Sequence, residues 1–228
     1  MPGDAPGSPP ASEVGGNQQH DALLRALQLQ REAYLHLPQQ QFEQLQALLF
    51  EYSDVFAVDD TVLGCVPDEK GVFHCIPTGS AEPVTQRPYK LSHHESLWLR
   101  VELKRLVRLG VIRPSKSAWM SPVVLVKKPN GGLRLCVDLR ALNKATLPDP
   151  YPLPRIEEVH AAMGGCTLWS QMDYVTGFWQ VPMKEEEYHK TGFTTPFGNY
   201  EFCRMAMDMM SAPSTFQRLM DEVLDSVT

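Results

Sequence analysis

Three cations lie close together in the sequence, beside a predicted tight turn. Lys127 and Lys128 end one β-rich run and Arg134 lies in the next, with Pro129-Asn130-Gly131-Gly132 between them. A cationic β-ribbon suits the binding of a triphosphate, because arginine offers a bidentate fork and lysine a movable point charge. Lysines are also common where they protect the edge of a sheet. The spacing alone leaves phosphate binding and edge protection both open.

A carboxylate at the end of a predicted strand is the second candidate. Asp173 closes an alternating run that begins at Thr167, and Gly177 marks a bulge or a close backbone approach soon after it. Carboxylate oxygens are ligands of Mg²⁺, so an aspartate at this position can hold an ion above a sheet. Aspartates at strand ends also serve as turn formers. The residue type does not decide between the two roles.

The charges are segregated along the chain. The net charge is −6, yet residues 87–144 carry 13 basic and 3 acidic side chains. Residues 1–86 carry 12 acids against 3 bases, and residues 145–228 carry 12 acids against 5 bases. A middle segment with a net charge of +10 is typical of a phosphate-binding surface, and a solvated charged face is the alternative.

Composition limits the class of protein. With 228 residues, of which 43% are hydrophobic and 21% charged, the chain can build a sizeable core. Its apolar runs are far shorter than a membrane span, and its first thirty residues lack the apolar stretch of a secretory signal. Five cysteines without C-x-x-C spacing favour free thiols. We therefore expect an intracellular protein, cytoplasmic or nuclear, that is neither secreted nor membrane-spanning.

Helices mixed with antiparallel hairpins must position these groups, which predicts an α+β fold. The helix from Ser92 to Leu109 has the clearest signals, a capping box from Ser92 to Glu95 and a stop at Gly110. Other helices are expected over 21–37, 38–52, 138–144, 156–163 and 212–223. Strands are expected over 123–128, 133–137, 167–173, 178–183, 191–195 and 200–203. In the helix 92–109 we expect the core-facing residues Leu97, Val101, Leu103, Leu106, Val107 and Leu109.

The chain divides into three predicted regions. Residues 1–18 are rich in Pro, Gly and Ser, which predicts a disordered tail. Residues 19–86 are expected to form a helical and then extended spacer, whose extended part lies along another surface. Residues 87–228 form the main domain.

The amino-acid sequence of that domain resembles one family. The stretch from RPYKL to PRIEEV resembles the fingers and early palm of reverse transcriptases from gypsy-type LTR retrotransposons. LWSQMDYVTGFWQVPM resembles polymerase motif A, while KTGFTTPFGNYEF and SAPSTFQRLMDEVL resemble the segment leading through motif B. The resemblance is strong over 87–228 and weaker over 42–86. It implies the fingers and an incomplete palm of a right-hand polymerase.

The resemblance also implies roles for individual residues. Asp173 matches the first catalytic aspartate, which binds both Mg²⁺ ions, and the backbone carbonyl of Tyr174 assists one of them. Lys128 and Arg134 match the residues that hold the incoming deoxynucleoside triphosphate (dNTP), with Lys127 a weaker match. Phe178 matches the aromatic gate that excludes a ribose 2′-hydroxyl.

The activity implied is RNA-templated DNA synthesis by two-metal nucleotidyl transfer. Mg²⁺ is the implied cofactor, and the implied partners are an RNA template, DNA or an RNA–DNA hybrid, and dNTP. Two departures stand against activity in this chain alone. The family's Tyr-x-Asp-Asp hairpin follows the last helix and is not reached by Thr228, so two of three catalytic aspartates are absent. Asp208 occupies the position of a motif B glycine beside the nucleotide.

Two other functions remain open from the sequence. One is a non-catalytic nucleic-acid binder that uses the basic middle segment. The other is a protein-interaction remnant that binds a partner chain or downstream segments of a polyprotein.

Overall fold

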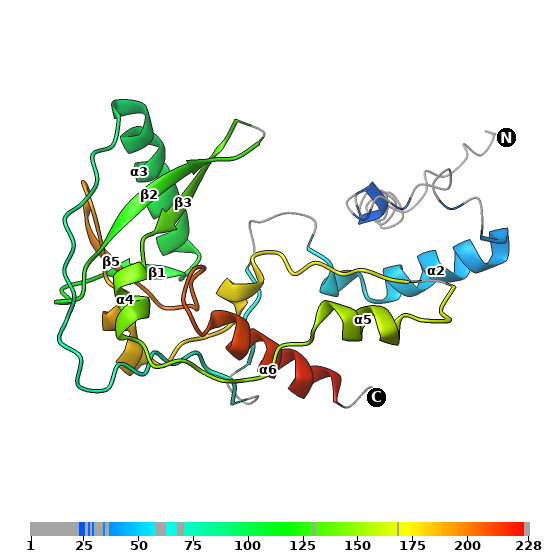
Figure 1. Ribbon diagram of the computed structural model, residues 1–228. Helices are drawn as coiled ribbons and strands as arrows, with labels where there is room; N and C mark the ends of the chain where they lie inside the picture. Colours follow the sequence, from blue (N-terminus) through cyan, green and yellow to red (C-terminus); the bar gives the residue numbers. More distant parts are fainter. Residues whose placement is uncertain are drawn as a thin grey trace, which may run out of the picture. The chain divides into compact units, whose positions relative to one another are not determined.

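The computed structural model describes residues 23–25, 27, 29, 34, 37–57, 63–67, 71–129, 131–167 and 169–225 (Figure 1). They fall into two compact units, one before Leu63 and one from Leu63 onward. The predicted tail at 1–18 lies outside the described residues, as does most of the helix expected over 21–37. In the first unit, α2 (Gln39–Glu51) confirms the helix expected over 38–52. The short 3-10 helix η2 (Ser53–Val55) follows it.

A five-stranded sheet organises the second unit, in the order β1-β5-β4-β2-β3. The strands are β1 (Ile112–Pro114), β2 (Ser121–Lys127), β3 (Leu133–Val137), β4 (Phe193–Thr195) and β5 (Gly198–Phe202). Both predicted hairpins are present, because β2 pairs antiparallel with β3 and β4 antiparallel with β5. A parallel pairing of β2 with β4 joins the two hairpins. Sheet and helices together confirm the α+β prediction.

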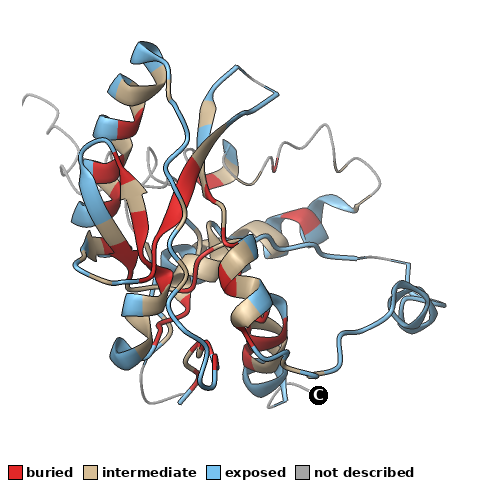
Figure 2. Ribbon diagram, turned by 60° about the vertical axis from the view of Figure 1, so that its left-hand side comes forward, coloured by how far each residue is buried: buried red, intermediate tan, exposed pale blue. Residues whose placement is uncertain are grey.

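Helix α3 (His93–Arg108) begins at Ser92 with the predicted capping box, in which the Ser92 side chain accepts from the Glu95 backbone N–H. Its core stripe differs from the prediction. Leu99, Leu103 and Leu106 are buried, as a spacing of four and three residues requires of one helix face. Figure 2 shows this stripe along the helix. The prediction was wrong for three residues that lie off this stripe and are exposed, Leu97, Val101 and Val107.

Three further helices complete the second unit: α4 (Arg140–Ala145), α5 (Ile156–Ala162) and α6 (Ala212–Leu224). All three confirm predicted helices. In α6, Pro213 lies in the first turn, where its missing N–H costs no helical hydrogen bond. Leu219 of α6 is buried in the main core. None of the helices in the described ranges is long and apolar enough to cross a membrane.

Two predicted strands are absent from the described structure. Over 167–173, where Leu168 is not described, the chain is irregular and exposed, and no described strand pairs with it. Alternation of side chains cannot hold a strand without a neighbour that satisfies its backbone groups. The strand expected over 178–183 is instead the 3-10 helix η4 (Gly177–Gln180) followed by two isolated bridges. A longer 3-10 helix, η5 (Glu185–Thr191), comes next.

Residues 71–86, here called the strap, run extended across the second unit. His74 bridges to Met183, and Thr85 bridges to Met120. Val72 and Ile76 of the strap are buried in the main core. The strap is therefore part of the second unit, and two of its side chains complete that unit's core. The second unit begins at Leu63, which is upstream of residue 87, the predicted start of the main domain.

The strap carries a buried histidine whose titration should affect stability. His74 is 1% exposed, and its Nδ1 lies 2.9 Å from the Thr215 hydroxyl oxygen of α6. Burial lowers the pKa of His74 from 6.5 to about 4, although the negative charges of Glu187 and Asp149 act to raise it. The fold thus favours neutral His74, so its contribution is complete above pH 6.5 and is lost as the pH falls from 6.5 through 4.

We expect the free energy of unfolding to fall by roughly 3 kcal/mol across this pH window, as a shift of about two and a half pKa units implies. His74→Gln should flatten the fall, because glutamine does not titrate. Chemical unfolding at a series of pH values measures it. His160→Gln is the matched control, since His160 is exposed on α5. Equal slopes for His74→Gln and the wild type would contradict the assignment.

Candidate nucleic-acid interface

The predicted basic hairpin forms, and its cations gather at its outer end. Lys127 pairs with Leu133 and Val126 with Arg134 in the last two register positions before the turn. The Lys128 N–H donates to the Gly132 carbonyl at 2.8 Å, and Gly131 has φ +81°, a conformation that favours glycine. Lys127, Lys128 and Arg134 are all exposed. No ion pair found among the described residues involves them.

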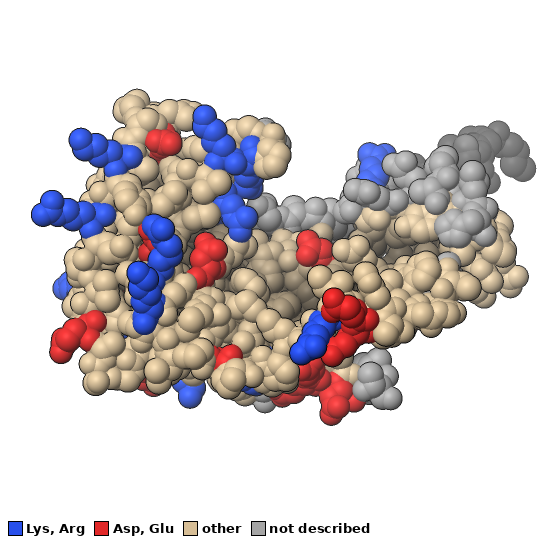
Figure 3. All heavy atoms as spheres, viewed as in Figure 1, with Lys and Arg blue, Asp and Glu red and all other residues tan. Residues whose placement is uncertain are grey.

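The surface charge follows this arrangement. In Figure 3, basic side chains gather over the β2–β3 hairpin and α4, whereas acidic side chains gather where α5 and α6 lie. The segregation seen along the chain thus becomes a segregation across one face of the second unit. A polyanion is attracted to the hairpin side of this face.

The stretch after Asp173 is held by α6. Tyr174 and Phe178 both pack edge-on against Phe216, with ring centroids 5.8 and 5.5 Å away. Gly177 permits this approach, because an added Cβ would lie 3.0 Å from the Tyr174 Cβ and 3.3 Å from the Phe216 ring. The close backbone approach predicted for Gly177 is therefore confirmed. Asp173 is exposed, and the gate role of Phe178 stays a prediction.

The donors near Asp173 do not by themselves make a two-metal site. Within the described residues, no three His, Cys, Asp or Glu side chains gather where they could hold a metal ion. The Tyr174 carbonyl already accepts a hydrogen bond from the Gly177 N–H at 3.2 Å. One carboxylate and one shared carbonyl supply a small part of the six oxygens that Mg²⁺ takes. The described residues therefore do not fit a pair of Mg²⁺ ions.

A cleft that the sequence did not predict lies beside the base of the hairpin. Its volume is about 380 Å³, and it is lined by Tyr89, Lys90, Leu91, Glu95, Val123, Val124, Leu125, Asp138 and Arg140. Arg140 donates to both Asp138 carboxylate oxygens, at 2.8 and 2.7 Å, and Tyr89 donates to one of them at 3.0 Å. Hydrogen bonds from Arg140 hold the pKa of Asp138 well below its usual range.

The exposed parts of this cleft suit single-stranded nucleic acid. The Asp138 side chain is 6% exposed, whereas that of Arg140 is 81% exposed. Asp138 thus orients an arginine whose guanidinium faces solvent, and Tyr89 offers a half-exposed ring for stacking. The sequence carries one signal for this cleft: Asp138 and Arg140 lie two residues apart, directly after the second strand of the hairpin.

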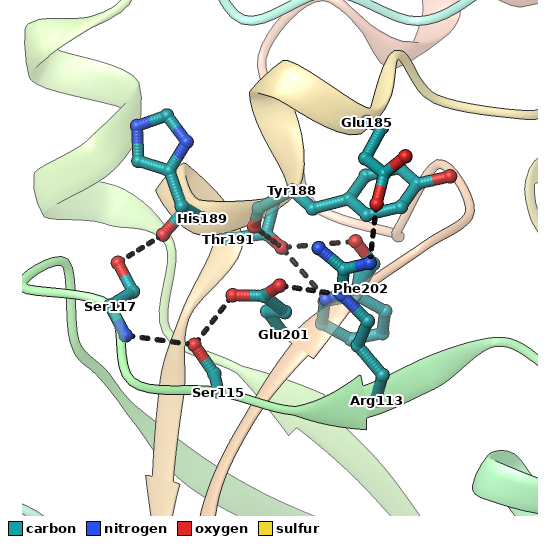
Figure 4. Close-up of polar contacts among 9 residues, drawn as sticks. All are labelled: Arg113, Ser115, Ser117, Glu185, Tyr188, His189, Thr191, Glu201 and Phe202. Atoms are coloured by element: carbon teal, nitrogen blue, oxygen red, sulfur yellow. Dashed lines mark hydrogen bonds and ion pairs between the residues drawn. The ribbon is translucent and has the colours of Figure 1, made fainter.

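A second polar cluster is structural. Arg113 of β1 donates to Glu201 of β5 and to Glu185 of η5, both at 2.8 Å (Figure 4). The Arg113 guanidinium also lies 4.7 Å from the Tyr188 ring centroid. The Glu185 and Glu201 carboxylates raise the pKa of Arg113. This cluster fixes η5 against the β1 edge of the sheet, away from the basic hairpin.

The fold is that of a right-hand polymerase. The native protease–reverse transcriptase of prototype foamy virus superposes with a TM-score of 0.73 and 25% identity, over 88% of this chain and 27% of that one. The foamy viral enzyme in complex with an RNA/DNA hybrid gives a TM-score of 0.69 at 19% identity, over 100% of this chain and 28% of that one.

Sequence comparisons give the family. The model described as reverse transcriptase (RNA-dependent DNA polymerase) matches residues 126–228. The Pol polyprotein of the Drosophila melanogaster transposon 297 is 32% identical over 83% of this chain. That of transposon gypsy is 36% identical over 70%. The chain spans 18% and 16% of these two polyproteins. Residues 126–228 therefore belong to the reverse transcriptase family, and the chain is a relative of gypsy-type retrotransposon Pol polyproteins.

Proposed function

We propose that this chain supplies the nucleotide-binding and template-binding part of an RNA-directed DNA polymerase. The observation that carries the proposal is the exposed cation cluster at the end of the β2–β3 hairpin, which lies within the matched reverse transcriptase segment. Arg134 binds the triphosphate through its two-pronged guanidinium, and Lys128 adds a movable charge. Lys127 contributes to the same anion site. The electrostatic stabilisation that phosphoryl transfer needs comes largely from such groups.

The template is proposed to pass through the cleft beside the hairpin. Arg140 contacts its phosphates and Tyr89 stacks on an unpaired base. A foamy viral neighbour of the same fold was solved with an RNA/DNA hybrid, which supports an RNA template and a hybrid product as partners. Phe178 is proposed to exclude a ribose 2′-hydroxyl from the nucleotide site.

Asp173 is proposed as one metal ligand of a larger site. The activity belongs to a polypeptide that also contains a Tyr-x-Asp-Asp sequence, which residues 1–228 lack. With those carboxylates present, Asp173 and the Tyr174 carbonyl would hold Mg²⁺, which supplies charge stabilisation when bound. The 228-residue polypeptide alone is expected to extend no primer.

Nucleic-acid binding without catalysis is the second candidate. It is favoured by one observation, that the described residues offer many exposed cations and no grouped metal ligands. Five free cysteines support an intracellular location for either function.

Replacing Lys127, Lys128 and Arg134 together by Ala tests the interface shared by both candidates. We expect weaker binding of an RNA–DNA hybrid and a smaller salt dependence, because fewer counterions are released on binding. The slope of log K against log salt should fall by about one for each phosphate that the variant no longer neutralises, and so by up to about three. Fluorescence anisotropy across a salt series measures it.

A matched control removes three cations from the outer face of α3, by changing Arg100, Lys104 and Arg108 to Ala. These side chains are also exposed, so the total charge removed is equal. An equal decrease of slope in the two triple variants would show non-specific attraction to net charge. It would reject the hairpin as the binding site.

A further inference from the structure

One side chain ties α4 to the loop that precedes α6. The Asn143 Nδ2 donates to the backbone carbonyl of Asp208 at 2.8 Å. The backbone N–H of Met210 donates to the Asn143 Oδ1 at 3.0 Å. The donor and the acceptor of one side-chain amide therefore hold residues 208 and 210, which lie 65 and 67 positions further along the chain.

The loop held in this way has a left-handed residue at its tip. Asp208 has φ +67° and is one of two non-glycine residues with positive φ in the described part of the chain. Such a conformation strains a residue that carries a Cβ, although aspartate tolerates it better than most. On either side the chain is anchored, because Ala206 and Met209 are buried. The conformation is thus imposed by fixed ends and by the Asn143 amide.

The tip of the loop faces β3, the second strand of the basic hairpin. The Arg134 guanidinium contacts the Met207 sulfur. Burial raises the pKa of the Cys136 thiol on β3, and the negative charge of Asp208 raises it further. Arg134 and Cys136 lie two residues apart on the same strand, so their side chains share one face of the sheet. Met207 and Asp208 therefore border the anion site proposed above.

We propose that Asn143 is a positioning residue, which holds the Met207–Met210 loop in its left-handed turn and so places Met207 and Asp208 against β3 beside Arg134. Its significance for nucleotide binding rests on the proposed function of Arg134. Asn143 touches no nucleotide in this scheme. It acts through the loop and determines how close the Asp208 carboxylate lies to the triphosphate site.

The thiol of Cys136 reports on the loop without any nucleotide. In the full chain, Ser replaces the other four cysteines, Cys65, Cys75, Cys166 and Cys203, and the rate of Cys136 alkylation is measured against pH. Asn143→Ala should lower the pKa of Cys136, since the Asp208 charge moves away. Asp208→Asn should also lower the pKa of Cys136. In a protein that already carries Asp208→Asn, the further change Asn143→Ala should lower this pKa much less than it does when Asp208 is present. Asn199→Ala, at an exposed position of β5, is the control and should leave the pKa of Cys136 unchanged.

Thermal unfolding keeps the proposal testable if Asn143→Ala folds poorly. Glycine adopts positive φ without strain, so Asp208→Gly should recover about 2–4 °C of the melting temperature that Asn143→Ala loses. An unchanged Cys136 pKa in Asn143→Ala, or no recovery by Asp208→Gly, would overturn the positioning role.

Titration with inorganic tripolyphosphate separates the positioning role of Asn143 from the proposed anion site. If the wild type binds none while the thiol shift occurs, the anion site is wrong and the role of Asn143 stands.

Discussion

Deleting residues 1–86 should abolish cooperative unfolding, whereas deleting residues 1–62 should preserve it. The shorter product lacks the strap, whose Val72 and Ile76 are 7% and 2% exposed in the main core. Burial of one such side chain stabilises a fold by roughly 1.5–3 kcal/mol. Their joint removal takes away a large part of the roughly 5–15 kcal/mol typical of a whole domain.

Hydrogen bonds add to this expected destabilisation. The strap joins elements far apart in the chain, because the Leu147 N–H donates to the Pro77 carbonyl and the Lys190 Nζ donates to the Ile76 carbonyl. Without the strap these groups lose their partners. Differential scanning calorimetry of residues 63–228 and 87–228 measures the effect. A sharp transition in the 87–228 product would show that the strap is dispensable, and Ile76→Ala in the full chain should then cost far less than the roughly 2–5 kcal/mol we expect.

The largest effect on activity is expected at Asp173, in a polypeptide that has the rest of the metal site. We expect no primer extension from the 228-residue polypeptide with Mg²⁺ or Mn²⁺. Appending the Tyr-x-Asp-Asp hairpin and thumb of a related element should give weak extension. Adding Asp173→Asn to that chimera should lower it by at least about a thousandfold, since metal coordination contributes several kcal/mol.

Asp208 explains why the chimera should begin weak. Its backbone has the positive φ that a glycine would adopt without strain, and its negative charge raises the pKa of the Cys136 thiol, two residues from Arg134 on β3. Asp208→Gly with Met207→Phe should raise extension, mostly by lowering KM for the nucleotide, because a negative charge leaves the anion site. The matched control is Asp225→Gly, at the end of α6. Extension by the unmodified polypeptide, or a repaired chimera that tolerates Asp173→Asn, would reject these assignments.

The sequence by itself determined the elements whose signals are local. The hairpin of Lys127 and Arg134 follows from a Gly-containing turn between two β-rich runs, and α3 follows from the capping box of Ser92 and Glu95. These interactions join residues a few positions apart, so each segment carries most of the information for its own geometry. The candidate binding residues on the hairpin could be predicted for the same reason.

Only the tertiary structure decided the rest. The residues before Asp173 alternate like a strand, yet they remain irregular because a strand needs a neighbour. Asn143 and Asp208, or Arg113 and Glu201, lie 65 and 88 positions apart, and no local pattern marks them as partners. His74 is buried although its segment is acidic and rich in proline. Such pairs form only when the folded chain brings distant segments together, since burial and pairing are properties of the whole packed unit.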